Sequence, residues 1–423
     1  MKNTNVCFHA AEILLPDFDR VDGTKWAVVA CDQYTSEPAY WEEAARTVGG
    51  APSTLPLILP EVYLSETEAR VPAINAAMQK TLRTNLLAHP DAMIYLERTQ
   101  ADGRIRRGVI GAVDLECYDY QKGSTSLIRA TEGTVLERIP PRVAIRRDAP
   151  IEFPHIMLLI DDPARTVIEP LIAPTARRAP IYDFDLMQNG GHVRGVLLSK
   201  EEQSGLREAL AELITPAQIE AKYGDASLSP LLFAVGDGNH SLATAKAAYE
   251  EVKARIGAEA AKEHPARYAL AEVVNLHDEA LDFEPIYRVV FGVDPQAFLN
   301  ELTAYLSEQN GGAAAQIIRC ITADRDFKML VPHPVQQLAV GTLQSFLSEY
   351  TAKNPHAEVD YIHGEDSLKS LLDRPDAVGF LFEGMRKDEL FRTVIFDGAL
   401  PRKTFSMGHA YDKRYYIEGR RIK

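Results

Sequence analysis

Long apolar runs are missing from this sequence, and so is any excess of positive charge. No stretch approaches the ~20 consecutive apolar residues that a membrane-spanning helix needs, and the N-terminal segment around His9 and Glu12 has no apolar signal core. The chain has 60 Asp and Glu against 46 Lys and Arg, for a net charge of -14. Such a charge disfavours nonspecific attraction to a polyanion. We therefore expect a cytoplasmic protein that binds neither membranes nor nucleic acid.

Cysteine is scarce, and two familiar nucleotide-binding motifs are absent. The four cysteines, Cys7, Cys31, Cys117 and Cys320, have none of the short spacings of zinc ribbons or redox dithiols. We expect all four to be reduced thiols. The sequence contains neither Gly-x-x-x-x-Gly-Lys-Ser/Thr nor Gly-x-Gly-x-x-Gly, so any nucleotide site must be of another kind.

What the sequence does contain is the composition of a folded α/β protein. Its 423 residues are 46% hydrophobic and 25% charged, and this length exceeds what a single core usually fills. Short apolar runs alternate with helical patterns, which predicts a mixed sheet with flanking helices. A glycine-rich turn at 309–312 follows a helical pattern over 295–306. We place a domain boundary near residue 291, giving a main domain 1–290 and a smaller α/β domain 291–423.

Individual elements are predicted from local patterns. Apolar runs of strand length predict strands at 26–30, 93–96, 108–113, 156–160, 193–198, 231–235 and 392–396. Pro38 and Gly49 delimit a predicted helix whose Trp41 we expect in the core. Ser65–Glu68 and Ser199–Glu202 both have the capping-box pattern, in which the first and fourth side chains satisfy free backbone donors. Each should open a helix.

The leading candidate site is the turn between the strand pattern at 231–235 and a following helix, with the sequence Asp237-Gly238-Asn239-His240-Ser241. Glycine permits positive φ, and the next helix directs its free N–H groups and positive dipole end at the turn. Phosphate is the obvious ligand. Asp237 could hold Mg²⁺, and His240 and Ser241 could donate hydrogen bonds to phosphate oxygens. The alternative is an ordinary connection in which Asp237 merely caps the helix.

Two weaker clusters lie elsewhere in the chain. Lys403 and Thr404, which follow the strand pattern at 392–396 and a short turn, offer an ammonium and a hydroxyl suited to phosphate oxygens. Glu132, among small and hydroxyl residues, could act as a general base. For all three residues, simple solvation is the competing interpretation.

Taken in order along the chain, these segments resemble the bacterial domain-of-unknown-function family DUF1015, which is similar to ParB/sulfiredoxin-fold proteins and to the free-serine kinases among them. The family's Asp-Gly-His-His-Arg turn corresponds to 237–241, its Pro-His-Glu-x-Thr segment to 130–134, and its late Pro-x-Lys-Ser/Thr segment to 401–404. Asp32 loosely matches the aspartate of an early Pro-Tyr-Asp segment. The resemblance implies a ParB/sulfiredoxin-like core with a smaller C-terminal α/β unit, whose last segment returns to the site.

The resemblance also assigns roles to residues. It implies Glu132 as catalytic base, and Asp237 with His240 as the groups that handle metal and phosphates. Gly238, Asn239 and Ser241 would complete the phosphate turn, and Lys403 with Thr404 a late phosphate-binding pair.

Departures from the family pattern leave the substrate and nucleotide undecided. Asn239 stands in place of the first histidine of the turn, Ser241 in place of the arginine, and Ala130-Thr131 in place of Pro-His. The missing bidentate phosphate contact could be restored by Arg129, by Arg142, or by His192 with Arg194. The basic C-terminal end at 413–423 is a further source, although a solvated tail is the simpler interpretation.

The predicted function is a nucleotide-dependent phosphotransferase that uses ATP or ADP and Mg²⁺ and acts on a small hydroxylated metabolite, with serine the first to try. A nucleotide-sensing ParB-like binding module without turnover is the alternative. Metal-dependent hydrolysis through Asp237, His240 and His192 lacks a His-x-His or His-Glu-x-x-His motif. The sequence does not choose the acceptor or ATP over ADP, and it leaves a homo-oligomer open.

Overall fold

The protein is described here by a computed structural model of residues 5–134 and 139–423, which form two compact units. Unit 1 comprises Met1–Ala130, Thr134–Leu281 and His409–Lys423, and unit 2 comprises Thr131–Gly133 and Asp282–Gly408. These limits differ from the predicted domains 1–290 and 291–423. Strand β14 (Phe283–Phe291) runs through the predicted boundary without a break and pairs within the sheet of unit 2, so the chain changes unit before residue 291.

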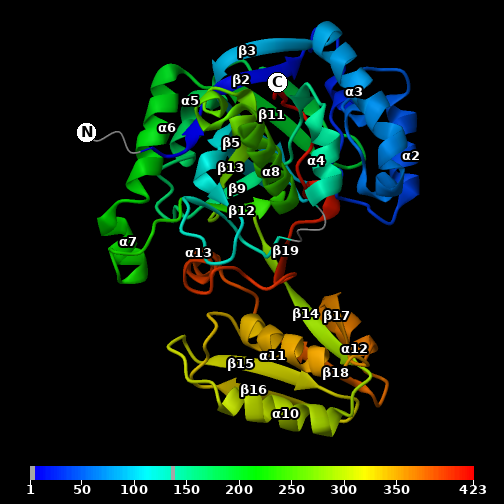
Figure 1. Cartoon of the computed structure of the whole chain (residues 1–423), viewed down its shortest axis with the longest axis vertical. Coiled ribbons are helices and arrows are strands. Elements are labelled where there is room, and N and C mark those ends of the chain that lie inside the picture. The colour runs from blue at the N-terminus through cyan, green and yellow to red at the C-terminus, as the bar shows by residue number, and fades with distance from the viewer. Residues whose placement is uncertain (1–4, 135–138) are drawn as a thin grey trace. The chain divides into compact units, whose positions relative to one another are not determined.

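Unit 1 is built on a ten-stranded mixed sheet in the order β10-β11-β4-β5-β13-β9-β12-β7-β6, with β1 also paired to β5 (Figure 1). Its strands are β1 Phe8–His9, β4 Ile94–Thr99, β5 Ile105–Asp114, β6 Tyr118–Asp119, β7 Ile128–Ala130, β9 Met157–Ile160, β10 Tyr182–Asp185, β11 His192–Leu197, β12 Phe233–Asp237 and β13 Tyr268–Asn275. The pairs β9/β13, β7/β12 and β6/β7 are parallel, and β4/β5 and β5/β13 antiparallel. Two small antiparallel sheets accompany it, β2 (Ala11–Pro16) with β3 (Leu86–Ala92) and β8 (Ile151–Glu152) with β20 (Arg420–Arg421). The predicted mixed α/β class is confirmed.

Both faces of this sheet are buried, as the alternation of its side chains shows. Along β4, Ile94 and Leu96 enter one hydrophobic core and Tyr95 enters the other, because successive side chains of a strand point to opposite faces. The helices of unit 1 are α1 Gly23–Trp26, α2 Pro38–Val48, α3 Thr67–Thr84, α4 Ile139–Arg147, α5 Ile172–Ala176, α6 Lys200–Glu212, α7 Pro216–Tyr223, α8 Asn239–Ile256 and α9 Ala258–Ala261. Helix α8 packs Leu242 and Tyr249 into the second core and lies beside α4 (Figure 1).

Unit 2 has its own sheet, in the order β16-β15-β18-β14-β17, with β19 paired to β14. The strands are β14 Phe283–Phe291, β15 Gln316–Ile321, β16 Asp326–Val331, β17 Glu358–His363, β18 Ala377–Leu381 and β19 Phe405–Met407. The helices are α10 Pro295–Ser307, α11 Ala339–Lys353, α12 Glu365–Ser370 and α13 Lys387–Phe396. The aromatic side chain of Phe298 on α10 packs against Phe346 on α11 and Phe380 on β18, so these elements share one core.

Two of the predicted strands are wrong. Residues 392–396 belong to helix α13, whose buried Leu390, Phe391 and Val394 follow a helical spacing, and a short apolar run does not distinguish helix from strand. At 26–30 the chain leaves helix α1 at Trp26, and Val29 makes only an isolated bridge with Tyr415.

The two predicted capping boxes have different outcomes in the structure. Ser199 does form the predicted capping box at the start of α6, and Trp41 is buried as expected. Ser65, in contrast, lies inside the 3₁₀ turn Glu61–Glu66 that precedes α3 and makes no cap.

The expectation of four reduced thiols is also wrong. Cys7 and Cys117 form a disulfide with a Cα–Cα distance of 6.3 Å, while Cys31 and Cys320 remain free thiols. The pair is distant in sequence but not in space, because β1 follows Cys7 directly and pairs Phe8 with Val113 of β5. Among the described residues, no helix combines the length and the apolar character that crossing a membrane requires.

Candidate functional site

The predicted phosphate turn in unit 1 depends on Gly238. This residue has φ 79° and ψ 28° and is the N-cap of α8, a left-handed conformation that glycine adopts at no steric cost. A Cβ at this position would lie 2.7 Å from the carbonyl oxygen of His155, so a larger residue does not fit. As the N-cap, Gly238 offers no side chain to the first N–H groups of α8, which leaves the positive end of the helix dipole for a ligand.

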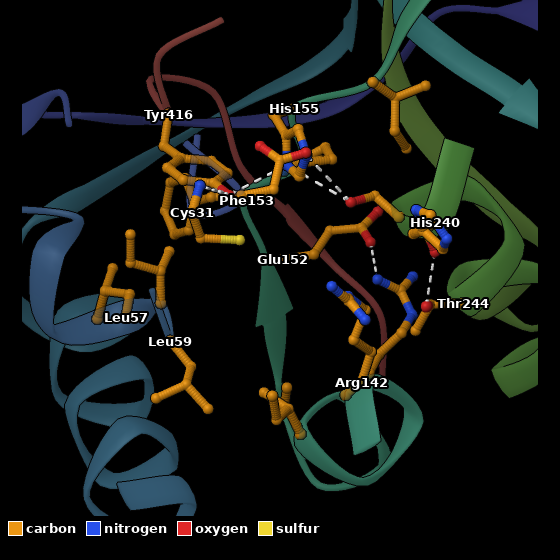
Figure 2. A pocket seen from close by; sticks show the side chains of 18 of the residues that line it. Cys31, Leu57, Leu59, Arg142, Glu152, Phe153, His155, His240, Thr244 and Tyr416 are labelled. Carbon is orange, nitrogen blue, oxygen red and sulfur yellow. Dashed lines mark hydrogen bonds and ion pairs between the residues drawn. The ribbon is translucent and has the colours of Figure 1, made fainter. Parts of the chain in front are cut away.

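A cavity of about 160 Å³ lies beside the start of α8. His240, Ser241 and Thr244, from the first two turns of the helix, form part of its wall. Figure 2 shows His240 and Thr244 on one side of this pocket, with Leu57 and Leu59 on the other. The turn predicted from the sequence therefore borders a cavity within unit 1.

His155 is the centre of a polar group in this cavity. Its Nε2 lies 3.3 Å from Asp32 Oδ2, and its Nδ1 lies 3.0 Å from the hydroxyl of Tyr416. Ser241 Oγ is 3.4 Å and 3.5 Å from the two ring nitrogens. Because both nitrogens already have closer partners, Ser241, His155 and Asp32 are not aligned as a nucleophilic triad.

Charge links His155 to Asp32. Burial lowers the pKa of His155, but the charge of Asp32 and the hydrogen bond to it raise that pKa, and the result lies above the ordinary 6.5. For Asp32, burial acts to raise the pKa, yet the charge of His155 and the hydrogen bond to it hold the pKa well below its usual value. The pair thus favours a carboxylate and an imidazolium.

Asp237 lies at the end of β12, just before the turn. Its Oδ1 accepts a hydrogen bond from the N–H of Gly238 at 3.0 Å, and its Oδ2 lies 3.6 Å from Lys413 Nζ. This Oδ2 is buried and accepts no hydrogen bond from the described residues. A single carboxylate with a spare oxygen fits Mg²⁺ held mainly by phosphate and water. The described part of the chain contains no preformed metal site, because no group of three or more His, Cys, Asp or Glu side chains there could hold a metal ion.

Buried charges fasten the last segment of the chain, 409–423, within unit 1. Arg414 donates to Glu272 at 3.0 Å and to Glu418 at 2.6 Å, and all three side chains are almost completely buried. Glu272 also pairs with Arg106. This network brings Lys413 to Asp237 and Tyr416 to His155, so the interpretation of the basic end as a solvated tail is wrong for Lys413 and Arg414.

The remaining predicted residues lie in unit 2. Glu132 forms a parallel bridge with Leu400, shortly before Lys403 and Thr404 in the chain. The Thr404 hydroxyl donates to the carbonyl of Pro401 at 2.7 Å and the residue is 2% exposed. Lys403 is exposed, with Nζ 5.0 Å from the centre of the Tyr361 ring.

A buried arginine holds this segment of unit 2. Arg288 donates to the carbonyl oxygens of Lys403 and Arg402 at 2.9 Å and 3.0 Å. Burial lowers the pKa of Arg288 to about 10, while the charges of Tyr361 and Glu132 act in the opposite direction. Glu132, Arg288 and the 402–404 segment thus form one neighbourhood within unit 2.

The structure therefore collects the predicted residues in two groups. Asp237, Gly238, Asn239, His240 and Ser241 share the turn of unit 1, whereas Glu132, Lys403 and Thr404 share a neighbourhood of unit 2. A single pocket formed by all of them stays a prediction.

Sequence reasoning missed His155 and Tyr416 and gave Lys413 no specific role. The only available signal was the unusual basic end of an acidic chain. Of the arginines considered as phosphate ligands, Arg142 lines the cavity, paired with Glu61. Arg129 instead donates to the carbonyl oxygens of Ser126, Ser229 and Pro230.

Comparison with known proteins identifies the family. The sequence model of the family described as "Protein of unknown function (DUF1015)" matches residues 17–367, and the chain belongs to this family. No curated protein matches the sequence.

Solved structures give weaker likenesses. A conserved hypothetical protein from Pyrococcus furiosus is 10% identical with a TM-score of 0.34, over 73% of this chain and 93% of that one. A free serine kinase in complex with AMP is 9% identical with a TM-score of 0.36, over 72% and 90%. SbnI with a C-terminal truncation, from Staphylococcus aureus, is 10% identical with a TM-score of 0.33, over 71% and 82%.

Proposed function

We propose that this protein is a nucleotide-dependent phosphotransferase acting on a small hydroxylated metabolite, with the phosphates bound at the N-terminus of α8. The observation that carries the proposal is the Gly238 turn, which leaves the first N–H groups of α8 uncapped by their N-cap residue beside a cavity. Helix N-termini reached through a glycine turn are anion sites. The order of motifs, which resembles that of the DUF1015 family and through it the related free-serine kinases, supports a nucleotide as the phosphate donor.

Three groups would bind the transferred phosphate. The N–H groups of Asn239 and His240 would point at its oxygens, and the Ser241 hydroxyl, 3.4 Å or more from either nitrogen of His155, would donate a further hydrogen bond. Lys413, 3.6 Å from Asp237, would supply positive charge. Mg²⁺ entering with the nucleotide would neutralise developing charge, with Asp237 as its carboxylate ligand.

Two carboxylates compete for the role of general base. The family resemblance implies Glu132, in unit 2. Within unit 1, Asp32 borders the cavity beside Ser241 and is held in its charged form by His155. A carboxylate with a strongly lowered pKa is a weak base but orients a hydroxyl well, so within unit 1 Asp32 would position the acceptor hydroxyl.

The test is a paired measurement of binding and turnover. Titration calorimetry with AMP, ADP and ATP, with and without Mg²⁺, gives nucleotide affinity, and phosphoryl transfer to a panel of hydroxylated metabolites gives turnover. Ser241→Ala and Lys413→Met should weaken nucleotide binding about tenfold each. Absence of nucleotide binding to the wild-type protein would end the proposal.

The roles of the two carboxylates are distinguished by the variants Glu132→Gln and Asp32→Asn. The first should lower kcat by at least 100-fold with little change in nucleotide affinity, and the second should mainly raise the KM for the acceptor. Nucleotide binding without turnover of any acceptor would instead favour a nucleotide-sensing module.

A further inference from the structure

The cavity beside α8 has two walls of opposite character. The polar wall consists of Ser241 and its helix with the Asp32–His155 pair. The apolar wall consists of Leu57, Leu59, Met78, Ile145 and Phe153, from four separate parts of unit 1. Figure 2 shows Leu57 and Leu59 across the pocket from His240.

The apolar wall provides little to hold water. The side chains of Leu57 and Ile145 contain no hydrogen-bonding atoms. Two arginines also line the cavity, and each is engaged by a carboxylate, Arg142 by Glu61 and Arg146 by Glu152. Water enters a cavity only where it finds about two to four polar partners. The apolar part of the cavity is therefore suited to an apolar group.

The size of the cavity limits that group. Its volume is about 160 Å³, close to the ~150 Å³ of an apolar cavity known to bind benzene. Because this volume includes the polar side of the cavity, an apolar group of about four to six carbon atoms together with its hydroxyl would fill it. The side chain of free serine has one carbon and one hydroxyl, and would leave the apolar wall without contacts.

We propose that the acceptor is a hydroxylated molecule with a compact apolar group of about four to six carbon atoms, which occupies this wall while its hydroxyl lies at the polar wall. This inference rests on the proposed phosphotransferase function. Burial of the apolar group would supply binding energy away from the reacting hydroxyl, which fixes the hydroxyl near the N-terminus of α8. Free serine is then a poor acceptor.

A matched ligand series tests the proposal. Serine, threonine, 3-hydroxyleucine and 3-phenylserine share the amino-acid head and the hydroxyl and differ in the apolar group on the β-carbon. With ADP bound, affinity measured by calorimetry should rise along the series, by at least tenfold from serine to 3-hydroxyleucine, since each added methylene contributes a factor of about four. Equal affinity for serine, 3-hydroxyleucine and 3-phenylserine would overturn the inference.

A second probe does not depend on the amino-acid head or on turnover. Benzyl alcohol should shift the methyl NMR signal of Met78, assigned through Met78→Leu, in protein labelled at the methionine methyl groups. Leu59→Phe, which fills the cavity, should abolish the shift, whereas the control Leu330→Phe, at a residue 65% exposed in unit 2, should not. An unmoved Met78 signal in the wild-type protein would overturn the inference.

These outcomes separate the two proposals. If ADP fails to bind while benzyl alcohol still shifts Met78, the phosphotransferase fails and the apolar cavity site stands. If ADP binds but neither the ligand series nor Met78 responds, the acceptor class is wrong. Should Leu59→Phe not fold, Leu59→Ala, which enlarges the cavity, should favour 3-phenylserine over 3-hydroxyleucine more strongly than the wild-type protein does.

Discussion

Each unit uses a buried arginine to hold a chain segment close to residues that were predicted to bind phosphate. The two units neutralise the charge of that arginine differently. In unit 1, Arg414 is held by two buried carboxylates, Glu272 and Glu418. In unit 2, Arg288 is 0% exposed and donates to main-chain carbonyl oxygens, with its guanidinium 4.9 Å from the centre of the Tyr361 ring. The first arrangement is an ion network. In the second, the hydrogen bonds go to neutral acceptors, and the charge of Glu132 also acts on Arg288.

The difference extends to the hydroxyl group that was predicted as a phosphate ligand in each unit. In unit 1, the contacts of Ser241 Oγ with described side chains are the long ones to His155, at 3.4 Å and 3.5 Å. In unit 2, the single hydroxyl proton of Thr404 is already donated to Pro401 at 2.7 Å. The comparison shows that residue type alone does not identify a phosphate contact, because a hydroxyl used inside the protein cannot donate to a ligand at the same time.

The largest expected effect comes from breaking the two arginine anchors. Arg414→Met leaves Glu418 as a buried carboxylate without its cation and should lower the free energy of unfolding by about 3–5 kcal/mol. Arg288→Met leaves the carbonyl groups of Arg402 and Lys403 unpaired and removes the positive charge that acts on Glu132, and should cost about 1–3 kcal/mol. Urea denaturation measures both, and hydrogen exchange locates each loss in its own unit.

The matched control is Arg421→Met, because the Arg421 side chain is 44% exposed and pairs with Glu12 at the surface. This substitution should cost no more than about 1 kcal/mol. Equal effects of Arg414→Met and Arg288→Met would mean that the ion network and the neutral anchor are energetically equivalent, and the contrast between the units would disappear.

The second prediction concerns the turn itself. Gly238→Ala places a Cβ 2.7 Å from the His155 carbonyl in a left-handed conformation, and should cost about 1–3 kcal/mol of stability together with nucleotide binding. Gly224→Ala is the control, because Gly224 has the same φ of 79° but open space around its Cβ position. Strain alone should then cost about 1 kcal/mol and leave nucleotide affinity unchanged. Similar losses of affinity in both variants would argue against a site at the turn.

A third prediction uses pH to test the His155–Asp32 pair, which lies in unit 1. His155 has a pKa raised above 6.5 by Asp32, so the stability that this pair contributes is fully present below pH 6.5 and is lost as pH rises through the folded-state pKa. The difference in unfolding free energy between the wild-type protein and His155→Gln should therefore shrink as pH rises above 6.5. The fluorescence of Trp26 and Trp41, both in unit 1, follows this transition. A difference that grows with pH would show that His155 is neutral in the folded protein.

Much of the fold could be read from local sequence patterns. The capping box at Ser199 and the strand and glycine turn before α8 are local signals, and the structure contains them. Residues 392–396 were misassigned, because a five-residue apolar run fits helix and strand equally and the start of α13 at Lys387 lies outside it.

The part of the site that was not predicted from the sequence is formed by residues that lie far apart in the chain. His155 and Tyr416 are 261 positions apart and meet at 3.0 Å, and the disulfide joins residues 110 positions apart. No spacing rule for a single sequence reports such pairs. Lys413 was assigned to a tail because only the buried Arg414 network reveals that this segment is fixed within unit 1.

The smallest expected effect compares the two hydroxyl groups directly. Thr404→Val removes the bond to Pro401 and should cost about 1 kcal/mol of stability in unit 2, with nucleotide affinity unchanged, because its proton is not available to a phosphate. Ser241→Ala removes only long contacts, so its stability should change by less than ~0.5 kcal/mol, yet it should weaken nucleotide binding about tenfold. Titration calorimetry and urea denaturation on the same two variants give both values. Loss of nucleotide affinity in Thr404→Val but not in Ser241→Ala would reverse the assignment, and would make the segment 401–404 of unit 2 the phosphate site.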